Sequence, residues 1–457
     1  MDKNAQERSL ALECLEKVGE TATLEGYVAV VRAHGKIAFI DLRDRTGIIQ
    51  VGAFEGDLPQ EFGKLGTQDI VRIKGLVKAR GEKYTNPNIA TGTIEIEAKE
   101  LTVIQKSQEM PFDMAGKDLN LELPTLLDYR GLTLRHPKVS SIFKVQEAVI
   151  DSFRNALKNK GFTEFQAPVI IPQGAEGGSE VFEVDYFGKK AYLSQSPQFY
   201  KQILVGVYER VFSVNKTLRA EPSITTRHLA EVTTLDAEFG FITSWTDVLD
   251  MAEYVVKYVF ESVGKTCSEE LKLHNATLPV ITNSIPRVKL REAQEIILKR
   301  TGRDNKSEPD LTPEDEREIC RWSTEEKGSE LVFVTHYPVE KRPFYTFEDP
   351  QDKGYTLSAD LIGRGTEWMT GGQRINDLSV LTGNAQKRGI DLQKSELYFQ
   401  AFKYAMPPEG GFSFGSERIT MHILGLSNVR EASLFPRDME RVDTRFSAAH
   451  EKDKEKI

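Results

Sequence analysis

The stretch GGFSFGSER at positions 410–418 sets two glycines before an aromatic pair and ends in an arginine. A second stretch, Arg219-Ala220-Glu221, is followed closely by Thr226-Arg227-His228-Leu229. Arginine matches phosphate oxygens two at a time, and glycine lets the backbone approach a ligand closely. We therefore expect the two stretches to form one site for a polyphosphate and a flat base.

A third stretch adds carboxylates and another arginine: DLIGRGTEWMTGGQR, positions 360–374. Asp360 and Glu367, together with the hydroxyl of Thr370, offer hard oxygen ligands of the kind that magnesium prefers. Taken alone, such carboxylates are more often solvated surface groups. The order of all three stretches in one chain instead favours a single site for ATP, magnesium and a small anionic substrate.

The bulk composition describes a large globular chain. Its 457 residues predict two or three domains, and 39% hydrophobic with 28% charged residues is typical of a soluble protein. We expect no membrane span, because no apolar run reaches about 20 residues, and no signal peptide. The widely spaced cysteines Cys14, Cys267 and Cys320 indicate neither a disulfide framework nor a zinc site, which favours the cytoplasm.

Five short alternating segments lie between Thr21 and Ile104 and predict a small closed barrel, with an OB-fold as first candidate. They are residues 23–31, 37–42, 48–51, 70–77 and 94–98. Phe39 could stack on an unpaired base while Gln50 reads its edge, but periodicity alone favours a core position for Phe39. The basic run 72–83 is either a phosphate-facing surface or a solvated strand face, although the net charge of -9 argues against indiscriminate nucleic-acid binding.

The remaining chain alternates between helical and extended patterns. Residues 1–18 predict an amphipathic helix that buries Leu10, Leu12, Cys14 and Leu15. The glycine-rich loop at 174–178 could carry Glu176 and Ser179 over a substrate. Helices are expected at 139–160, 248–263, 378–387, 395–405 and 416–424, and strands at 161–172, 211–221, 233–241, 330–337 and 343–347.

These motifs, in this order, resemble the class II aminoacyl-tRNA synthetases from about Thr21 to Arg437. Residues 161–168 are similar to motif 1 of that family, which builds its dimer interface; 219–221 are similar to motif 2 and 410–418 to motif 3. The resemblance implies an α+β protein in three parts: an N-terminal helix and OB-fold anticodon-binding domain (1–108), a hinge (109–135), and a catalytic domain (136–457) with an antiparallel sheet flanked by helices. The absence of a GxGxxG or GxxxxGK[ST] motif agrees.

Smaller features resemble the aspartyl-tRNA synthetases of the short archaeal and eukaryotic type. QSPQFYK at 195–201 is similar to the family segment that holds the amino acid, and asparaginyl relatives usually carry glutamate where Asp236 stands. The resemblance implies a homodimeric aspartate–tRNA ligase that forms aspartyl-adenylate from L-aspartate and ATP and transfers the aspartyl group to tRNA-Asp. Whether tRNA-Asn is also charged stays open, as does the effect of Pro222 and Ile224 in the motif 2 loop on acceptor-end recognition.

The resemblance also implies a role for each site residue. Arg219 bridges the α-phosphate and the attacking carboxylate, and Arg418 is the second catalytic arginine. The implied ATP-binding residues are Arg219, Glu221, Arg227, His228, Glu367, Gly415 and Arg418. The implied aspartate-binding residues are Glu176, Ser179, Gln198, Lys201, Asp236, Thr370 and Arg374, with Arg374 on the side-chain carboxylate. Magnesium, the cofactor, is assigned to Asp360, Glu367 and Thr370, and the anticodon to Phe39 and Gln50.

Three alternatives compete with this interpretation. An asparaginyl enzyme is the nearest, and Asp236 argues against it. A paralogue that binds tRNA without charging it would not need Arg219, Glu221, Glu367 and Arg418. An ammonia-dependent asparagine synthetase built on the same catalytic fold would have no use for an anticodon-type barrel.

Overall fold

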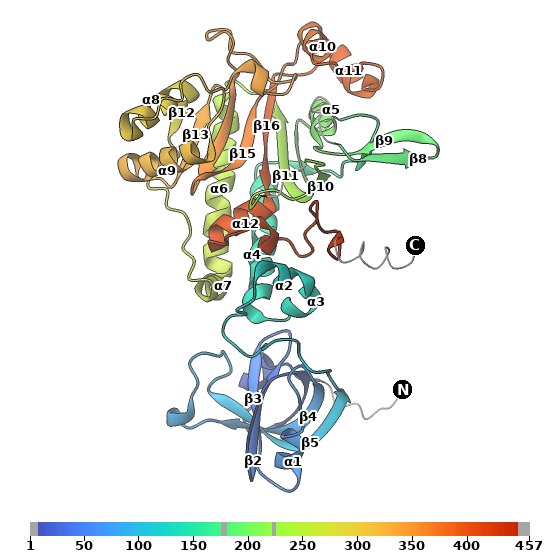
Figure 1. Cartoon of the computed structure of the whole chain (residues 1–457), viewed down its shortest axis with the longest axis vertical. Coiled ribbons are helices and arrows are strands. Elements are labelled where there is room, and N and C mark those ends of the chain that lie inside the picture. Colours follow the sequence, from blue (N-terminus) through green and yellow to red (C-terminus); the bar gives the residue numbers. More distant parts are fainter. Residues whose placement is uncertain (1–7, 175–180, 222–224, 447–457) are drawn as a thin grey trace. The chain divides into compact units, whose positions relative to one another are not determined.

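The computed structural model describes residues 8–174, 181–221 and 225–446. The chain divides into two compact units, Met1–Leu121 and Glu122–Ile457 (Figure 1). The boundary lies within the predicted hinge of residues 109–135, and the end of that hinge is helical. Its two short helices are α2 (Leu123–Asp128) and α3 (Arg130–Thr133).

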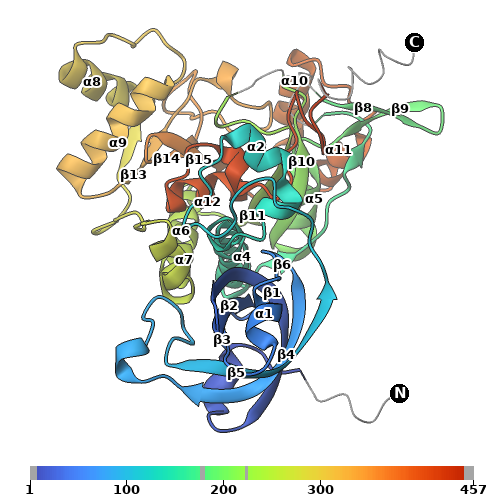
Figure 2. The same cartoon turned by 60° about the horizontal axis from the view of Figure 1, so that its bottom comes forward.

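The first unit is a closed five-stranded barrel, as predicted for an OB-fold (Figure 2). Around the barrel the strand order is β1-β2-β3-β5-β4. The strands are β1 (Thr21–His34), β2 (Ile37–Arg43), β3 (Ile48–Ala53), β4 (Ile70–Ala79) and β5 (Ile94–Gln105), with a short helix α1 (Leu58–Phe62) between β3 and β4. Closure leaves no long unpaired edge in the barrel.

Strand β2 shows how alternation builds the barrel core. Ala38, Ile40 and Leu42 are fully buried inside the barrel, because every second side chain of a strand points to the same face. Phe39 therefore lies on the outer face, outside the core cluster, and half-buried. The interpretation of Phe39 as a core residue is wrong.

The N-terminal segment differs from its prediction. Only a 3-10 helix, Leu12–Glu16, is present among the described residues of this segment. With three residues per turn, Ala11 and Cys14 share the buried side, while Leu12 and Leu15 share the other and are 37% and 39% exposed. The prediction that Leu12 and Leu15 are buried is wrong, whereas Leu10 and Cys14 are buried as predicted.

The basic run 72–83 is a solvated strand face. Four of its cations pair with acidic side chains on neighbouring strands: Arg72 with Glu25, Lys74 with Glu100, Lys78 with Glu97 and Arg80 with Glu95. Because four of its five cations already face a carboxylate, the run presents no continuous positive surface to a phosphate backbone.

The second unit is built on an eight-stranded sheet with the order β12-β13-β14-β15-β16-β11-β10-β6 (Figure 1). All neighbours pair antiparallel except the outermost pairs, β12 with β13 and β10 with β6. The strands are β6 (Thr163–Glu164), β10 (Arg210–Leu218), β11 (Glu231–Gly240), β12 (Arg287–Lys289), β13 (Leu331–Thr335), β14 (Ser358–Gly363), β15 (Thr366–Gln373) and β16 (Glu409–Gly415). This is the predicted antiparallel sheet, and a small second sheet contains β7 (Ile170–Ile171), β8 (Glu183–Tyr186) and β9 (Lys189–Leu193).

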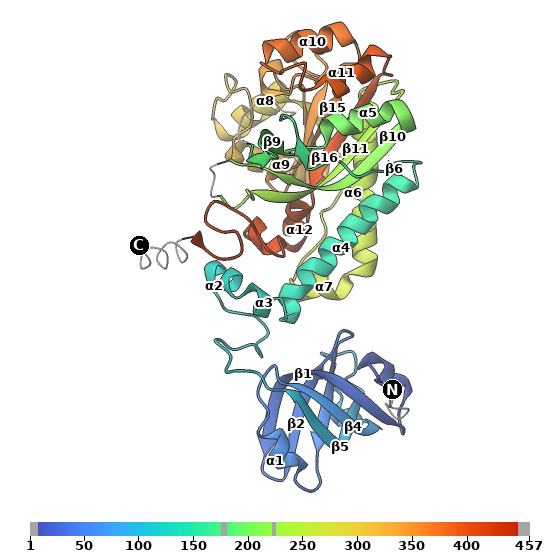
Figure 3. The ribbon, with the colours of Figure 1, turned by 90° about the vertical axis from the view of Figure 1, so that its right-hand side faces the viewer.

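Helices cover the main sheet in three groups. The largest core lies under α4 (Pro137–Lys158), α6 (Thr246–Thr266), α7 (Ser268–Leu273) and α12 (Ser416–Leu424), with α4 beside α6 (Figure 3). A second core joins α5 (Gln198–Tyr208), α10 (Leu378–Lys387) and α11 (Glu396–Lys403). A third lies between α8 (Leu290–Thr301), α9 (Pro313–Lys327) and the β12–β13 edge. Among the described residues, no helix combines the length and the apolar character needed to cross a bilayer.

Two predicted strands are not continuous. Residues 161–172 form only the two-residue strands β6 and β7, because Pro168 between them has no N–H to donate to a ladder. Residues 343–347 form a turn in which the Thr346 amide donates to the Pro343 carbonyl at 3.0 Å. That turn belongs to the long connection between β13 and β14, which reaches the site described next.

Candidate active site

A cavity of about 580 Å³ opens over the middle of the main sheet. This volume is in the range of small-molecule and cofactor sites. Most of the predicted ligand-binding side chains line it: Gln198, Lys201, Arg219, Glu221, Arg227, His228, Glu367, Thr370, Arg374, Gly415 and Arg418. The three stretches that stand apart in the sequence therefore meet at one place. Glu176 and Ser179 lie outside the described residues.

Strand register brings the polar side chains together. Asp236 on β11 lies opposite Ser413 on β16, Ser413 lies opposite Thr370 on β15, and Thr370 lies opposite Asp360 on β14. Directly opposite residues of antiparallel strands point to the same face. The four residues thus form one row across four strands, on the cavity side of the sheet.

A β-bulge places Glu367 in the same cavity. Glu367 and Thr370 are three residues apart, so a regular strand would point them to opposite faces. The β14–β15 register shifts at this point, since Leu361 pairs with Met369 and Ile362 with Glu367. The extra residue, Trp368, packs in the helix-covered core with Met369, and Glu367 returns to the cavity side.

The inner end of the cavity is a buried cluster of two cations and two carboxylates. The Lys201 ammonium lies 3.2 Å from Asp236 and 3.1 Å from Glu238. Arg374 donates from Nε to Glu238 at 2.7 Å and from Nη2 to the Gly411 carbonyl at 3.0 Å. Although burial opposes it, the charges of Arg374 and Lys201 lower the pKa of Glu238, which stays ionised.

Gly411 is required by this arrangement. A Cβ at position 411 would lie 2.2 Å from Glu238 Oε2 and 2.2 Å from the Ala237 carbonyl. The second glycine of the GGFSFGSER stretch therefore makes room for the carboxylate that holds Arg374. This is a structural use of glycine, beside the ligand approach expected from the sequence.

Two of the four cluster residues, Arg374 and Asp236, keep a polar atom for a substrate. Hydrogen bonds to described residues use Nε and Nη2 of Arg374 but not Nη1. Oδ2 of Asp236 is buried and has no hydrogen-bond partner within the described chain. Arg374 Nη1 and Asp236 Oδ2 are therefore available to bind a ligand that carries one negative and one positive charge.

The outer end of the cavity is lined by arginines. Arg219, at the end of β10, is 3.9 Å from Glu221 and 46% exposed. Arg418, in the first turn of α12, lies 3.6 Å from Glu367, and Gly415 caps that helix at the end where backbone N–H groups favour anions. Two fixed cations and a helix N-terminus make this end suited to phosphate.

Arg227 and His228 line the same end in a different state from that expected. Arg227 pairs with Glu316 of α9 at 2.7 Å, a carboxylate that the sequence did not single out. Burial lowers the pKa of His228; the charge of Glu221 opposes this shift, and three nearby arginines add to it. His228 is therefore a neutral imidazole at pH 7, able to donate a hydrogen bond to a phosphate without adding charge.

Asp360 and Glu367 fit a magnesium ion shared with a phosphate ligand. Burial, and after it the charge of Asp360, raises the pKa of Glu367. Asp360 Oδ1 is buried and has no hydrogen-bond partner in the described chain. Both observations favour a cation between the carboxylates. The described residues contain no cluster of three or more His, Cys, Asp or Glu side chains arranged for a metal. Magnesium commonly takes one or two carboxylates plus phosphate and water, and Asp360 and Glu367 are two carboxylates.

Arg342 is a site residue that the sequence reasoning missed. It donates from Nη2 to Asp360 at 2.8 Å and from Nη1 to Thr370 at 3.2 Å, and its guanidinium lies 3.9 Å above the Tyr337 ring. Its only sequence signal is its place directly before the 343–347 segment, for which a strand was predicted. Arg342 holds Asp360 Oδ2, while Oδ1 has no hydrogen-bond partner among the described residues.

In the barrel, Phe39 and Gln50 belong to an ordered outer face. Phe39 forms an edge-to-face pair with Phe54 at 5.5 Å. Gln50 donates to Glu95 at 2.9 Å and accepts from Arg32, which also binds Asp41. The amide of Gln50 is therefore held in one orientation beside an aromatic pair.

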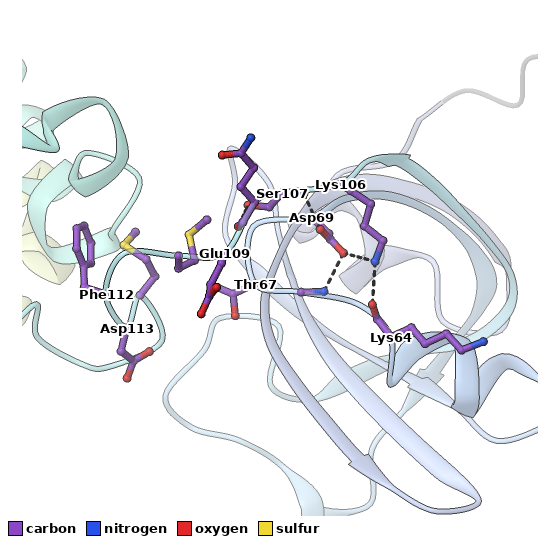
Figure 4. Close-up of a pocket in the computed structure, with 12 residues that line it drawn as sticks. Lys64, Thr67, Asp69, Lys106, Ser107, Glu109, Phe112 and Asp113 are labelled. Atoms are coloured by element: carbon purple, nitrogen blue, oxygen red, sulfur yellow. Dashed lines mark hydrogen bonds and ion pairs between the residues drawn. The ribbon is translucent and has the colours of Figure 1, made fainter.

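A second cavity of about 550 Å³ lies in the first unit and contains none of the predicted site residues (Figure 4). Asp69 accepts from Lys106 and from the amides of Gly66 and Ser107, each at 2.8 Å. These bonds satisfy the carboxylate and fix the end of β5 to the loop before β4. This cavity is therefore a structural feature of the barrel, lined by residues that hold β5 to that loop.

Comparisons with known proteins agree with this geometry. Residues 122–439 match the family model of class II tRNA synthetases (D, K and N), and residues 22–104 match that of the OB-fold nucleic acid binding domain. The chain is 40% identical to an aspartate–tRNA(Asp/Asn) ligase of Thermus thermophilus, over 95% of this chain and 99% of that protein. It is 37% identical to an aspartate–tRNA(Asp) ligase of Pyrococcus abyssi, over 93% and 96%. A solved asparaginyl-tRNA synthetase of Pyrococcus horikoshii, complexed with asparaginyl-adenylate, superposes with a TM-score of 0.87 at 31% identity, covering 95% of this chain and 99% of that one.

Proposed function

The chain belongs to the class II tRNA synthetases (D, K and N), and from this premise we propose that it is an aspartate–tRNA ligase. It activates L-aspartate with ATP and transfers the aspartyl group to tRNA-Asp. The observation that carries the proposal is the buried pair Lys201 and Arg374 at one end of a cavity whose other end holds Arg219 and Arg418. An anionic amino acid and a nucleotide fit these two ends.

Activation brings two anions together, so cations provide most of the catalysis. The α-carboxylate of aspartate attacks the α-phosphorus of ATP, and the bond to the β-phosphate oxygen breaks to release pyrophosphate. Arg219 binds both the α-phosphate and the attacking carboxylate. Arg418 and Arg227 neutralise the outer phosphates, and His228 donates a neutral hydrogen bond.

The remaining residues orient the two substrates. Glu221 accepts from the adenine amino group, and Gly415 leaves space at the start of α12. Arg374 and Lys201 bind the side-chain carboxylate of aspartate, while Gln198 and Asp236 face its ammonium group. We assign Glu176 and Ser179, in the 174–181 segment, to the same ligand.

Asp360, Glu367 and Thr370 would hold a magnesium ion, which would supply positive charge to neutralise the phosphates. In the second step the terminal ribose hydroxyl of tRNA attacks the aspartyl carbonyl. The bond to the AMP phosphate breaks, and a phosphate oxygen accepts the hydroxyl proton. The chain itself forms no covalent intermediate.

ATP–pyrophosphate exchange with each free amino acid tests the proposal. Exchange should depend on aspartate, and exchange with asparagine alone would replace the proposal with an asparaginyl enzyme. Side-by-side charging of purified tRNA-Asp and tRNA-Asn then defines the tRNA substrate, since the Thermus thermophilus relative carries both in its name. Exchange without charging of either tRNA would contradict the transfer step.

Asp360→Asn should raise the magnesium concentration needed for half-maximal exchange about tenfold or more, because the amide is neutral and binds a hard cation poorly. Electron paramagnetic resonance of Mn²⁺ bound to the protein–ATP complex gives a second readout that needs no turnover. Asp349→Asn is the control, because Asp349 is also buried but lies beside His336 outside the cavity. An unchanged metal requirement in Asp360→Asn would remove Asp360 from the metal site.

Phe39→Ala should raise the KM for tRNA-Asp about tenfold and leave ATP–pyrophosphate exchange unchanged, because an aromatic stack is worth about 1–3 kcal/mol per base. Initial rates of charging at varied tRNA concentration measure this. Tyr84→Ala removes an exposed aromatic from the connection between β4 and β5 and serves as control. An equal KM for tRNA-Asp in wild type and Phe39→Ala would contradict anticodon reading by this face.

We further propose that two copies associate through residues 161–172. The edge strand β6 and the exposed side chains of Val169 (40%) and Ile170 (47%) support an apolar contact there. Light scattering of the purified protein should give twice the mass of one chain, and Ile170→Lys should reduce it.

A further inference from the structure

One carboxylate beneath the amino-acid end of the cavity has no place in the mechanism above. Glu409, the first residue of β16, is 0% exposed. Its Oε1 accepts from Gln202 Nε2 at 2.9 Å. Its Oε2 is buried without a hydrogen-bond partner among the described residues.

Glu409 is joined to the cavity by a chain of side-chain hydrogen bonds. Gln202, itself 0% exposed, accepts at Oε1 from Gln198 Nε2 at 3.0 Å and from the Tyr398 hydroxyl at 3.1 Å. The amide of Gln202 is therefore fixed, with nitrogen toward Glu409 and oxygen toward Gln198. Gln198 lines the cavity, and no hydrogen bond among the described residues uses its Oε1.

The charges around Glu409 disfavour a further anion. Lys201 and Arg374 are matched by Asp236 and Glu238, so the cluster is already balanced. An ionised Glu409 would be a third buried carboxylate with no cation of its own. Burial, and after it the negative charge of Glu238, raises the pKa of Glu409 well above its ordinary value.

We propose that Glu409 is a positioning residue of the aspartate site, acting as a neutral carboxylic acid that anchors Gln202 and, through it, the ligand-facing Gln198. This inference rests on the proposed function. A neutral acid accepts the Gln202 N–H without adding a negative charge behind the cations that meet aspartate. An ionised group in the same place would weaken the attraction of Lys201 and Arg374 for an anionic substrate.

Two substitutions separate hydrogen bonding from charge. Glu409→Gln keeps an oxygen for Gln202 and is neutral, so the KM for aspartate should stay within about threefold of wild type. Glu409→Met keeps the volume but removes the acceptor, so a buried amide is left unpaired and Gln198 loses its anchor. The KM for aspartate should then rise about tenfold or more, with the KM for ATP within about twofold.

Gln202→Met breaks the same hydrogen-bond chain one residue nearer the cavity and should raise the KM for aspartate as Glu409→Met does. If one of the two variants fails to fold, the other still tests the inference. Glu318→Gln is the matched control, because Glu318 is a buried carboxylate on α9 outside the cavity. Infrared spectroscopy gives a readout without turnover: a protonated-carboxyl band present at pH 7 in wild type should be lost in Glu409→Gln.

Opposite results overturn the inference. A KM for aspartate raised as much by Glu409→Gln as by Glu409→Met would show that the negative charge matters and that the group is ionised. Equal rises in KM for aspartate and ATP would reduce Glu409 to a folding role, and so would KM values unchanged in every variant. If the wild type shows no aspartate-dependent exchange, the proposed function fails, while the infrared band still reports the state of Glu409.

Discussion

Arg374→Lys is expected to raise the KM for aspartate about a hundredfold, with less than about a threefold change in the KM for ATP. The planar guanidinium binds Glu238 through Nε, binds the Gly411 carbonyl through Nη2 and keeps Nη1 for a ligand. One ammonium cannot occupy these three positions. The lysine keeps the positive charge but loses the two-point contact with Glu238, which Lys201 still pairs at 3.1 Å.

The measurement is ATP–pyrophosphate exchange at varied aspartate and at varied ATP. Arg364→Lys is the matched control, because Arg364 also binds a carboxylate, Glu330, and backbone carbonyls, but does so at the turn between β14 and β15 away from the cavity. Equal losses for aspartate and ATP in Arg374→Lys would refute an aspartate-specific role. A melting temperature near that of the wild type would show that the loss does not come from unfolding.

Arg219→Ala is expected to lower kcat for adenylate formation about a hundred- to a thousandfold without a measurable change in stability. The arginine is the cation nearest both reacting anions in the proposed mechanism, and removing one group that stabilises transition-state charge has about this effect. Its ion pair with Glu221 is long, at 3.9 Å, and the side chain is 46% exposed. Such surface pairs contribute at most about 1 kcal/mol to folding.

Single-turnover formation of aspartyl-adenylate and thermal melting measure the two quantities separately. Arg210→Ala is the control, because Arg210 stands at the opposite end of the same strand, β10, and is not part of the cavity. A kcat within about fivefold of wild type would exclude Arg219 as a catalytic residue. A large fall in melting temperature would assign it to folding instead.

The barrel could be predicted from the sequence because its strands alternate apolar and polar residues at period two, a pattern that few other structures share. The N-terminal helix could not, because the sequence does not show that residues 12–16 adopt three residues per turn. In the 343–347 segment, β-branched and aromatic residues suggested a strand, and a proline-initiated turn prevailed.

In the candidate site, too, some residues could be predicted from the sequence and others could not. The arginines and carboxylates of the three stretches could be found because each stretch is short and dense in charge. Arg342 and Glu316 could not, because each meets its partner across a long sequence separation: 18 residues for Asp360 and 89 for Arg227. Nor could the sequence show that a bulge at Trp368 returns Glu367 to the cavity side, or that a neutral acid at Glu409 lies beneath the substrate.

The enzyme has a row of four residues, Asp236, Ser413, Thr370 and Asp360, whose spacing is fixed by the spacing of the strands that carry them. Adjacent strands keep a constant spacing, so the distance between the proposed amino-acid subsite and the proposed metal subsite is set by how many strands separate them. Lengthening the connections at either edge leaves that distance intact, whereas inserting one residue in β15 would turn one subsite away from the other. Evolution or engineering of a new amino-acid preference on this scaffold must therefore proceed through side chains and through α5, with the strands kept constant.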